Sequence, residues 1–157
     1  MIRVYTNFHD LNKYCPKDNY PTPFIDQIID SCARSEVFLF MDGFSWYNHI
    51  QIKMEEQHKT TFIYPWGTFV YKKIPFGLKN VGATFQRAMN FAFHDIKSIV
   101  EPYLDDLPTH SRKRIDHPVH LRLIFERCRH YKIHLNPHKC IFIVESGILL
   151  GFIVLNK

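Results

Sequence analysis

The chain has 157 residues, of which 46% are hydrophobic and 22% charged, with a formal net charge of +5 and a sequence pI near 9.0. This length suits one globular domain with its own core, and this composition excludes an intrinsically disordered chain. No apolar run approaches the ~20 residues of a membrane-spanning helix, and the start lacks a signal-peptide pattern, so we expect an intracellular protein whose compartment stays open.

The first 35 residues predict an irregular segment, because they are polar and contain Pro16, Pro21 and Pro23. The chain then changes character at Glu36. The run EVFLFMD predicts a buried strand that ends on a carboxylate, Asp42.

A hairpin is predicted from the β-rich runs 60–64 and 68–73, which the turn Pro65-Trp66-Gly67 separates. A helix is predicted over about 83–95. Its apolar positions recur at helical spacing and form one stripe: Phe85, Ala88, Met89, Ala92 and Phe93.

Asp105 and Asp106 are predicted to lie in a turn between two strand-like segments. A second helix should begin after Asp116, a predicted N-cap, and end near Tyr131. Its apolar face would consist of Leu121, Ile124, Phe125 and Cys128. The last apolar runs, CIFIV and GILLGFIV, predict a closing hairpin. This order of elements indicates an α+β domain with two helices packed on an antiparallel sheet.

The carboxylates of Asp42, Asp105 and Asp106 form the clearest candidate site, since each follows a strand or lies in a turn. Adjacent strands would bring them together, and clustered hard oxygen ligands suit Mg²⁺. Two such ions are typical of nucleotidyl transfer. A solvated turn and a helix cap remain the alternatives for acids in these positions.

The cysteines and histidines near the end of the chain allow a different hypothesis. Four cysteines lie far apart, so free thiols are expected rather than disulfides. A small zinc-binding domain is the alternative, although the spacing matches no usual zinc pattern. Its candidate ligands are Cys128, His130, His134, His138 and Cys140.

Several motifs resemble the polymerase region of long-terminal-repeat retrotransposons, especially gypsy-like elements of plants. These motifs are RVYTNFHDLNK, FLFMDGFSWYNHIQI, TTFIYPWGTFVYKKIPFGLKNVGATFQRAMN, YLDD, HLRLIFERCRHYKIHLNPHKC and LLGFIV. The resemblance covers the whole chain, and it implies a reverse transcriptase palm with partial fingers over residues 1–157. The thumb, connection and RNase H domains of the relatives' Pol polyprotein would then be absent.

The resemblance also implies roles for individual residues. Asp42, Asp105 and Asp106 would bind two Mg²⁺ ions, or Mn²⁺ in their place. The partners would be an RNA or DNA template–primer duplex and deoxynucleoside triphosphates, with no membrane involved and the oligomeric state open.

Further roles are implied for the nucleotide and template sites. Arg3 would contact the triphosphate, where its guanidinium can pair with phosphate oxygens. Tyr47 would crowd the sugar 2′ carbon and so select deoxynucleotides. Phe76 and Gly77 would border the nucleotide pocket, and Gln86 would pack under the template strand and bind the template–primer.

Three departures from the family pattern predict difficulties. Trp46 stands where relatives have Gly and would obstruct the triphosphate. Pro102 and Pro108 flank the YLDD motif and would weaken the catalytic hairpin, because proline removes a ladder donor. The alternative to an active polymerase is therefore an inactive retroelement remnant that binds nucleic acid weakly.

Overall fold

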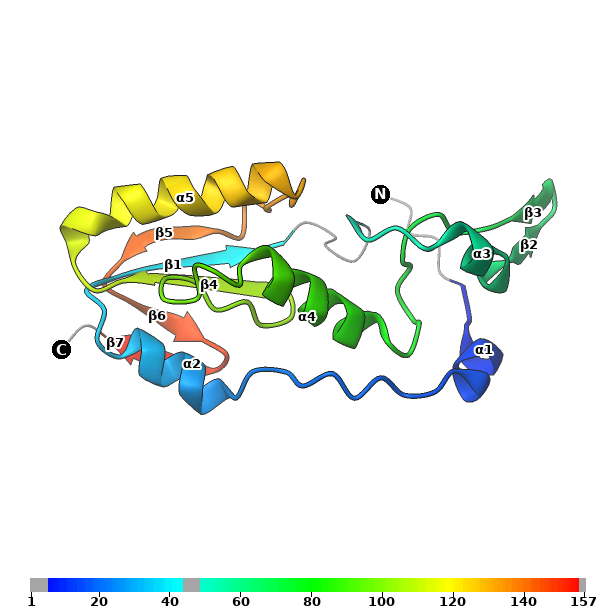
Figure 1. The fold of residues 1–157 in the computed structure, drawn as a ribbon, viewed down its shortest axis with the longest axis horizontal. Coiled ribbons are helices and arrows are strands. Elements are labelled where there is room, and N and C mark those ends of the chain that lie inside the picture. The colour runs from blue at the N-terminus through cyan, green and yellow to red at the C-terminus, as the bar shows by residue number, and fades with distance from the viewer. Residues whose placement is uncertain (1–5, 44–48, 156–157) are drawn as a thin grey trace.

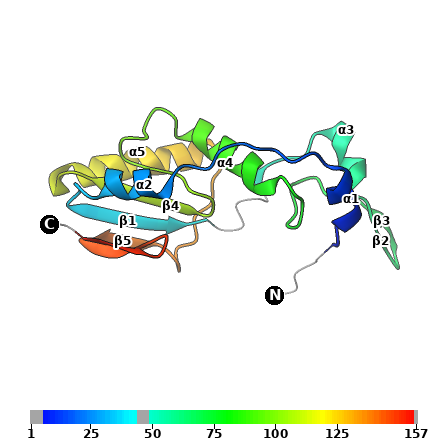
Figure 2. The same ribbon diagram turned by 90° about the horizontal axis from the view of Figure 1, so that it is seen from below.

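The computed structural model describes residues 6–43 and 49–155. These residues form an elongated molecule with a sheet lobe at one end and an outer lobe at the other (Figures 1 and 2). The sheet lobe contains α2 (Ile25–Cys32), β1 (Val37–Asp42), α4 (Val81–Ala92), β4 (Asp106–Ser111), α5 (His117–His130), β5 (Ile141–Val144), β6 (Ser146–Leu149) and β7 (Phe152–Leu155). The outer lobe contains α1 (His9–Tyr14), α3 (Met54–Gln57), β2 (Phe62–Tyr64) and β3 (Gly67–Phe69).

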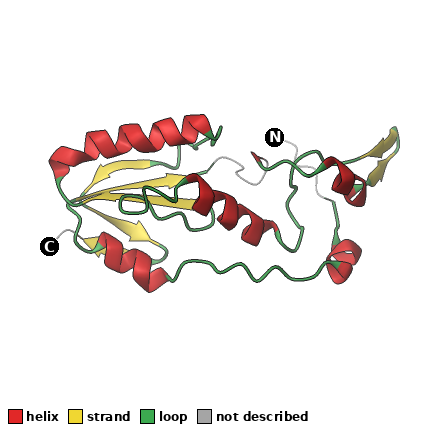
Figure 3. Cartoon of the chain, viewed as in Figure 1, coloured by secondary structure: helices red, strands yellow, loops and turns green. Residues whose placement is uncertain are grey.

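The central sheet has the strand order β4-β1-β5, and both pairings are antiparallel (Figure 3). The β1–β4 register runs without a break from Val37 opposite Ser111 to Asp42 opposite Asp106. The β1–β5 pairing shifts register between Phe38 and Phe40. Because β1 lies in the middle, its alternating side chains contact two different layers.

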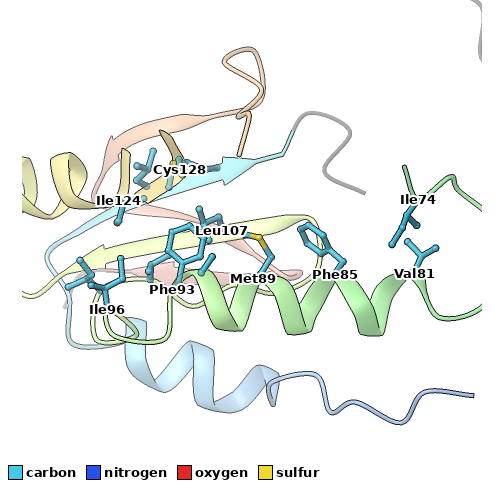
Figure 4. Close-up of a cluster of buried hydrophobic side chains, with 14 residues drawn as sticks. Ile74, Val81, Phe85, Met89, Phe93, Ile96, Leu107, Ile124 and Cys128 are labelled. Carbon is cyan, nitrogen blue, oxygen red and sulfur yellow. The ribbon is translucent and has the colours of Figure 1, made fainter. Parts of the chain in front are cut away.

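One face of the sheet carries the main core. Leu39 and Met41 of β1 and Leu107 of β4 pack there with the apolar sides of α4 and α5 (Figure 4). The helices contribute Val81, Phe85, Met89, Ala92, Ile124 and Cys128. The predicted apolar stripes thus exist because each helix buries one side against the sheet.

The other face carries a second, smaller core. Phe38 of β1 packs with Ile28 and Cys32 of α2, and with Leu149 and Val154 of the β6–β7 hairpin. The sheet is therefore the middle of three layers.

The outer lobe is organised around the β2–β3 hairpin, whose pairing runs from Phe62↔Phe69 to Tyr64↔Gly67. Aromatic rings continue from this hairpin toward α1. Phe62 contacts Phe69 and Tyr71 at centroid distances of 5.7 and 5.1 Å, and Tyr71 contacts Phe8 at 6.0 Å.

Helix α5 ends in a Schellman motif. Lys132 takes a left-handed conformation with φ 56, and the amide of Ile133 donates to the carbonyl of Cys128 over 2.8 Å. This ending turns the chain back across the sheet toward Leu135, which bridges Gly43 just beyond β1.

The α+β prediction, the strand at 37–42, the hairpin in the outer lobe and both long helices are confirmed. One detail of the helices was wrong, because Ala88 is exposed rather than on the buried stripe. Asp116 is the N-cap residue of α5, as predicted, although its side chain makes no cap hydrogen bond.

The prediction of an irregular N-terminal segment was wrong, because α1 and α2 form there. Pro16, Pro21 and Pro23 all lie between these helices, in the stretch that connects them. The apolar residues of α2, Ile25, Ile28, Ile29 and Cys32, have amphipathic spacing, and the helix is stabilised by burying Ile28 and Cys32.

The predicted closing hairpin was assigned to the wrong pair of strands. The run CIFIV forms β5, which pairs with β1. The hairpin lies inside the second run, between β6 and β7, and turns at Leu150 and Gly151, both with positive φ.

Candidate active site

The three candidate carboxylates lie at one end of the central sheet. Asp42 is the last residue of β1 and stands opposite Asp106, the first residue of β4. Asp105 precedes Asp106 in the turn, and its carbonyl accepts from the amide of Gly43 over 3.3 Å. Residues that are far apart in the sequence are thus brought together by the β1–β4 register.

The turn that carries Asp105 is a tight one. The backbones of Tyr103 and Asp106 exchange two hydrogen bonds of 2.9 Å each, and Leu104 has a φ of 47. Reciprocal bonds across two intervening residues define a two-residue hairpin, which favours a left-handed residue inside the turn. The predicted turn at the two acids is confirmed.

Gln86 of α4 supports this turn from below. Its side chain is 0% exposed, its Nε2 donates to the carbonyl of Pro102 over 2.7 Å, and its Oε1 accepts from the amide of Leu104 over 3.0 Å. Nε2 also donates to Asn90 Oδ1 over 3.1 Å. The amide is therefore fully engaged inside the protein, and a template contact through this side chain would require it to leave these bonds.

Asp106 is perturbed by its surroundings. Burial raises the pKa of the Asp106 carboxyl above its usual value, and the charges of Asp42 and Asp105 raise it further. The ammonium of Lys139 acts in the opposite direction. It also pairs with Asp42, with Nζ and Oδ2 3.2 Å apart.

A cavity of about 360 Å³ opens beside Asp42 and Asp106, between the sheet and the β6–β7 hairpin. Phe40, Pro108 and Leu149 supply apolar walls, and Lys139 lines the cavity together with the acids. The site therefore has a polar end formed by charges and an apolar end formed by the second core.

The prolines that flank the acids are both buried and both fit the hairpin. The backbone amide of Glu101 donates to the carbonyl of Pro108 over 3.1 Å, and the backbone amide of His110 donates to the carbonyl of Ile99 over 2.9 Å. Even-numbered residues of β4 therefore face the 99–103 segment and not β1, because the N–H and C=O of a strand residue point the same way. Pro108 omits one bond to Glu101 and leaves the β1–β4 ladder intact.

Pro102 also avoids the ladder. The amides of its neighbours, Glu101 and Tyr103, are the ones that donate to β4, so the nitrogen of Pro102 points away. The predicted weakening of the hairpin by these two prolines is therefore small.

The remaining predicted site residues fall into two groups, those outside the described residues and those in the loop before α4. Arg3, Trp46 and Tyr47 lie outside the described residues. Phe76 is 59% exposed, and Gly77 adopts a φ of 98 that favours glycine. The carbonyl of Gly77 accepts from Asn12 Nδ2 over 2.7 Å, so α1 holds this loop at the start of α4.

Metal-ligand geometry is not preformed. Within residues 6–43 and 49–155, no three carboxylate, imidazole or thiol groups converge closely enough to hold a metal ion. The three acids share one edge of the sheet and offer the oxygen donors that Mg²⁺ prefers, but coordination would need their side chains to turn toward one point.

The zinc alternative gains no support from its candidate ligands. Cys128 is buried in the main core, where burial raises the pKa of its thiol to about 12. In the described part of the chain these groups do not converge on a metal site. All four cysteines are free thiols, as predicted.

No helix in the described part of the chain is long and apolar enough to cross a membrane.

Comparison with known proteins gives a consistent result. Residues 1–154 match the family described as reverse transcriptase (RNA-dependent DNA polymerase). Among curated proteins, the Transposon Tf2-3 and Tf2-7 polyproteins of Schizosaccharomyces pombe are 29% and 28% identical over 157 residues. The match covers 99% of this chain and 12% of each polyprotein.

Solved structures show the same fold. A foamy viral protease-reverse transcriptase in complex with an RNA/DNA hybrid matches 95% of this chain with a TM-score of 0.82 at 17% identity, and the match covers 20% of that chain. A complex of the same viral protein with dsDNA matches 98% of this chain with a TM-score of 0.86 at 18% identity, covering 32% of that chain. The chain therefore belongs to the reverse transcriptase (RNA-dependent DNA polymerase) family, as a domain of the kind found in retrotransposon polyproteins.

Proposed function

We propose that this domain supplies the catalytic carboxylates of an RNA-directed DNA polymerase from a gypsy-like retrotransposon of the plant type. The observation that carries the proposal is the register that sets Asp42 opposite Asp106, with Asp105 in the adjoining turn. Acids that lie at the same end of two paired strands repel one another, which destabilises the fold. Binding of divalent cations at this place would neutralise their charge.

In this proposal Asp42, Asp105 and Asp106 hold two Mg²⁺ ions, or Mn²⁺, which would supply activation of a primer 3′-hydroxyl and charge stabilisation at the leaving pyrophosphate. The protein residues do the positioning. The register fixes Asp42 against Asp106, and Gln86 fixes the turn through Pro102 and Leu104.

The template–primer duplex and deoxynucleoside triphosphates are the proposed partners. The neighbouring structures with an RNA/DNA hybrid and with dsDNA support a nucleic acid partner. Arg3 and Tyr47 are proposed for the triphosphate and the sugar, and Phe76 and Gly77 for the border of the nucleotide pocket, on the family resemblance.

The test is incorporation of a labelled deoxynucleotide on an RNA template with a DNA primer, first with Mg²⁺ and then with Mn²⁺. We expect incorporation by the parent and none by the Asp105→Ala, Asp106→Ala variant. The matched control is Asp26→Ala, Asp30→Ala, which removes the same charge from exposed positions of α2.

Circular dichroism would establish that each variant is folded. A folded parent that incorporates nothing would contradict the polymerase proposal and favour the inactive remnant. Incorporation that survives in the Asp105→Ala, Asp106→Ala variant would contradict the assignment of the site.

A further inference from the structure

Lys139 lies beside the acids although it belongs to neither a strand nor a helix. Its Nζ lies 3.2 Å from Asp42 Oδ2, and it lines the same cavity as Asp42 and Asp106. Its side chain is 63% exposed, whereas that of Asp42 is 25% exposed. The ammonium thus reaches from solvent to a half-buried carboxylate.

The backbone around Lys139 is built against the end of β1. The amide of Asn136 donates to the carbonyl of Asp42 over 2.9 Å, and Leu135 bridges Gly43. The amide of Lys139 then donates to the carbonyl of Asn136 over 3.0 Å, which closes a turn. This turn fixes the base of the lysine beside the acids and leaves only its flexible stem free to move.

A lysine ammonium and a divalent cation compete for the same carboxylate oxygens. Lys139 reduces the repulsion among the three acids by placing a single positive charge beside Asp42. A divalent ion at Asp42 would meet that charge at short range, so the two cannot be accommodated together without movement of the lysine.

We propose that Lys139 is a resident counter-ion, which neutralises Asp42 in the metal-free protein and is displaced into solvent when a divalent cation binds. This inference rests on the proposed metal-binding role of the acids. It implies that the intrinsic affinity of the acids for a divalent ion is higher than the parent protein shows, because each binding event must first break the Lys139–Asp42 pair.

The probe is Mn²⁺ alone, titrated against the folded chain and followed by its electron paramagnetic resonance signal. We expect Lys139→Gln to bind Mn²⁺ roughly three- to tenfold more tightly than the parent, since a nearby like charge has been removed. Lys139→Arg keeps the charge and should bind as weakly as the parent.

The matched control is Lys59→Gln. This variant also removes one charge from an exposed ion pair, with Glu56 in the outer lobe, and its Mn²⁺ affinity should stay within twofold of the parent. The Asp105→Ala, Asp106→Ala variant should lose the site and identifies any binding elsewhere.

Equal affinities in the parent and in Lys139→Gln would overturn the inference, as would weaker binding in Lys139→Gln, because the lysine would then assist the ion. Failure of the proposed function gives a different result. If Lys139→Gln binds Mn²⁺ more tightly than the parent but the parent incorporates no nucleotide, only the polymerase proposal is contradicted. If the parent incorporates nucleotide but Lys139→Gln binds Mn²⁺ no more tightly than the parent, only the counter-ion proposal is contradicted.

Discussion

The backbone amide of Leu104 donates to the Oε1 atom of Gln86 over 3.0 Å, and this bond ties the turn of the candidate site to the middle of α4. The same side chain donates to the carbonyl on the other side of the turn, at Pro102. A buried amide that satisfies two backbone groups is difficult to replace, because each group left alone loses its hydration without compensation.

Gln86→Leu should therefore lower the free energy of unfolding by about 2 to 4 kcal/mol. It should also reduce nucleotide incorporation, because the backbone beside Asp105 loses its support. Urea denaturation measures the first effect. Arg87→Leu, on the exposed side of α4, is the control and should change stability by less than about 1 kcal/mol. A Gln86→Leu variant as stable as this control would contradict the supporting role.

Gly147 permits the β6–β7 hairpin to lie against the sheet. A Cβ at this position would overlap the ring of Phe40, which the second core and the cavity share. Gly147→Ala should lower the free energy of unfolding by about 1 to 3 kcal/mol.

Gly82 provides a control of opposite sign. It lies in α4, and a Cβ there would come no closer than 3.9 Å to Leu104, so Gly82→Ala should raise stability by about 0.5 to 1 kcal/mol. Chemical denaturation of both variants decides the matter. Similar effects from the two substitutions would show that Phe40 moves aside freely.

The buried His110 should make the free energy of unfolding depend on pH. It is 4% exposed, its Nδ1 and the Ser35 hydroxyl form a 3.0 Å hydrogen bond, and burial lowers its pKa to about 4, with Arg112 and His120 contributing. The unfolded chain therefore takes up this proton first as the pH falls. The free energy of unfolding should drop by roughly 2 to 4 kcal/mol between pH 6.5 and pH 4.

His110→Gln should flatten this dependence in part, because burial also lowers the pKa of His117. Melting temperatures measured across this range would test the prediction, and an unchanged slope in His110→Gln would refute it.

The register of β4 predicts unequal tolerance to proline at neighbouring positions. Pro108→Ala should change the free energy of unfolding by less than about 1 kcal/mol, because only the bond to Glu101 is at stake. Thr109→Pro should lower it by about 3 kcal/mol or more, since Thr109 pairs with Leu39 of β1. Equal losses at both positions would mean that the register is different.

Sequence patterns were sufficient to predict the elements whose hydrophobic periodicity is clear. The strand ending at Asp42, the turn at Asp105 and the apolar sides of α4 and α5 all follow from local spacing. Helix α2 could have been found from its isoleucine spacing, but the prolines nearby outweighed it. The partner of β5 could not be predicted, because an apolar run of that length pairs equally well with any exposed strand edge.

The contacts that Gln86 and Lys139 make with the candidate site could not be predicted from the sequence. Gln86 is polar in an otherwise apolar stripe, and only the fold shows that Pro102 and Leu104 lie above it. Lys139 follows an Asn-Pro turn like many surface lysines, so its pairing with Asp42 depends on the path of the chain after α5. The effect of the prolines depends on which side of the strand each nitrogen faces, and composition does not reveal that.

The central position of β1 has a consequence for how the chain folds. Its partners β4 and β5 both come much later in the sequence, so during synthesis the apolar strand leaves the ribosome long before either edge can be paired. Pairing between strands so distant in the sequence is slow, and it leaves an aggregation-prone intermediate with exposed hydrophobic surface. Newly made chains should therefore depend on chaperones, and isolated preparations should refold best when dilute and cold.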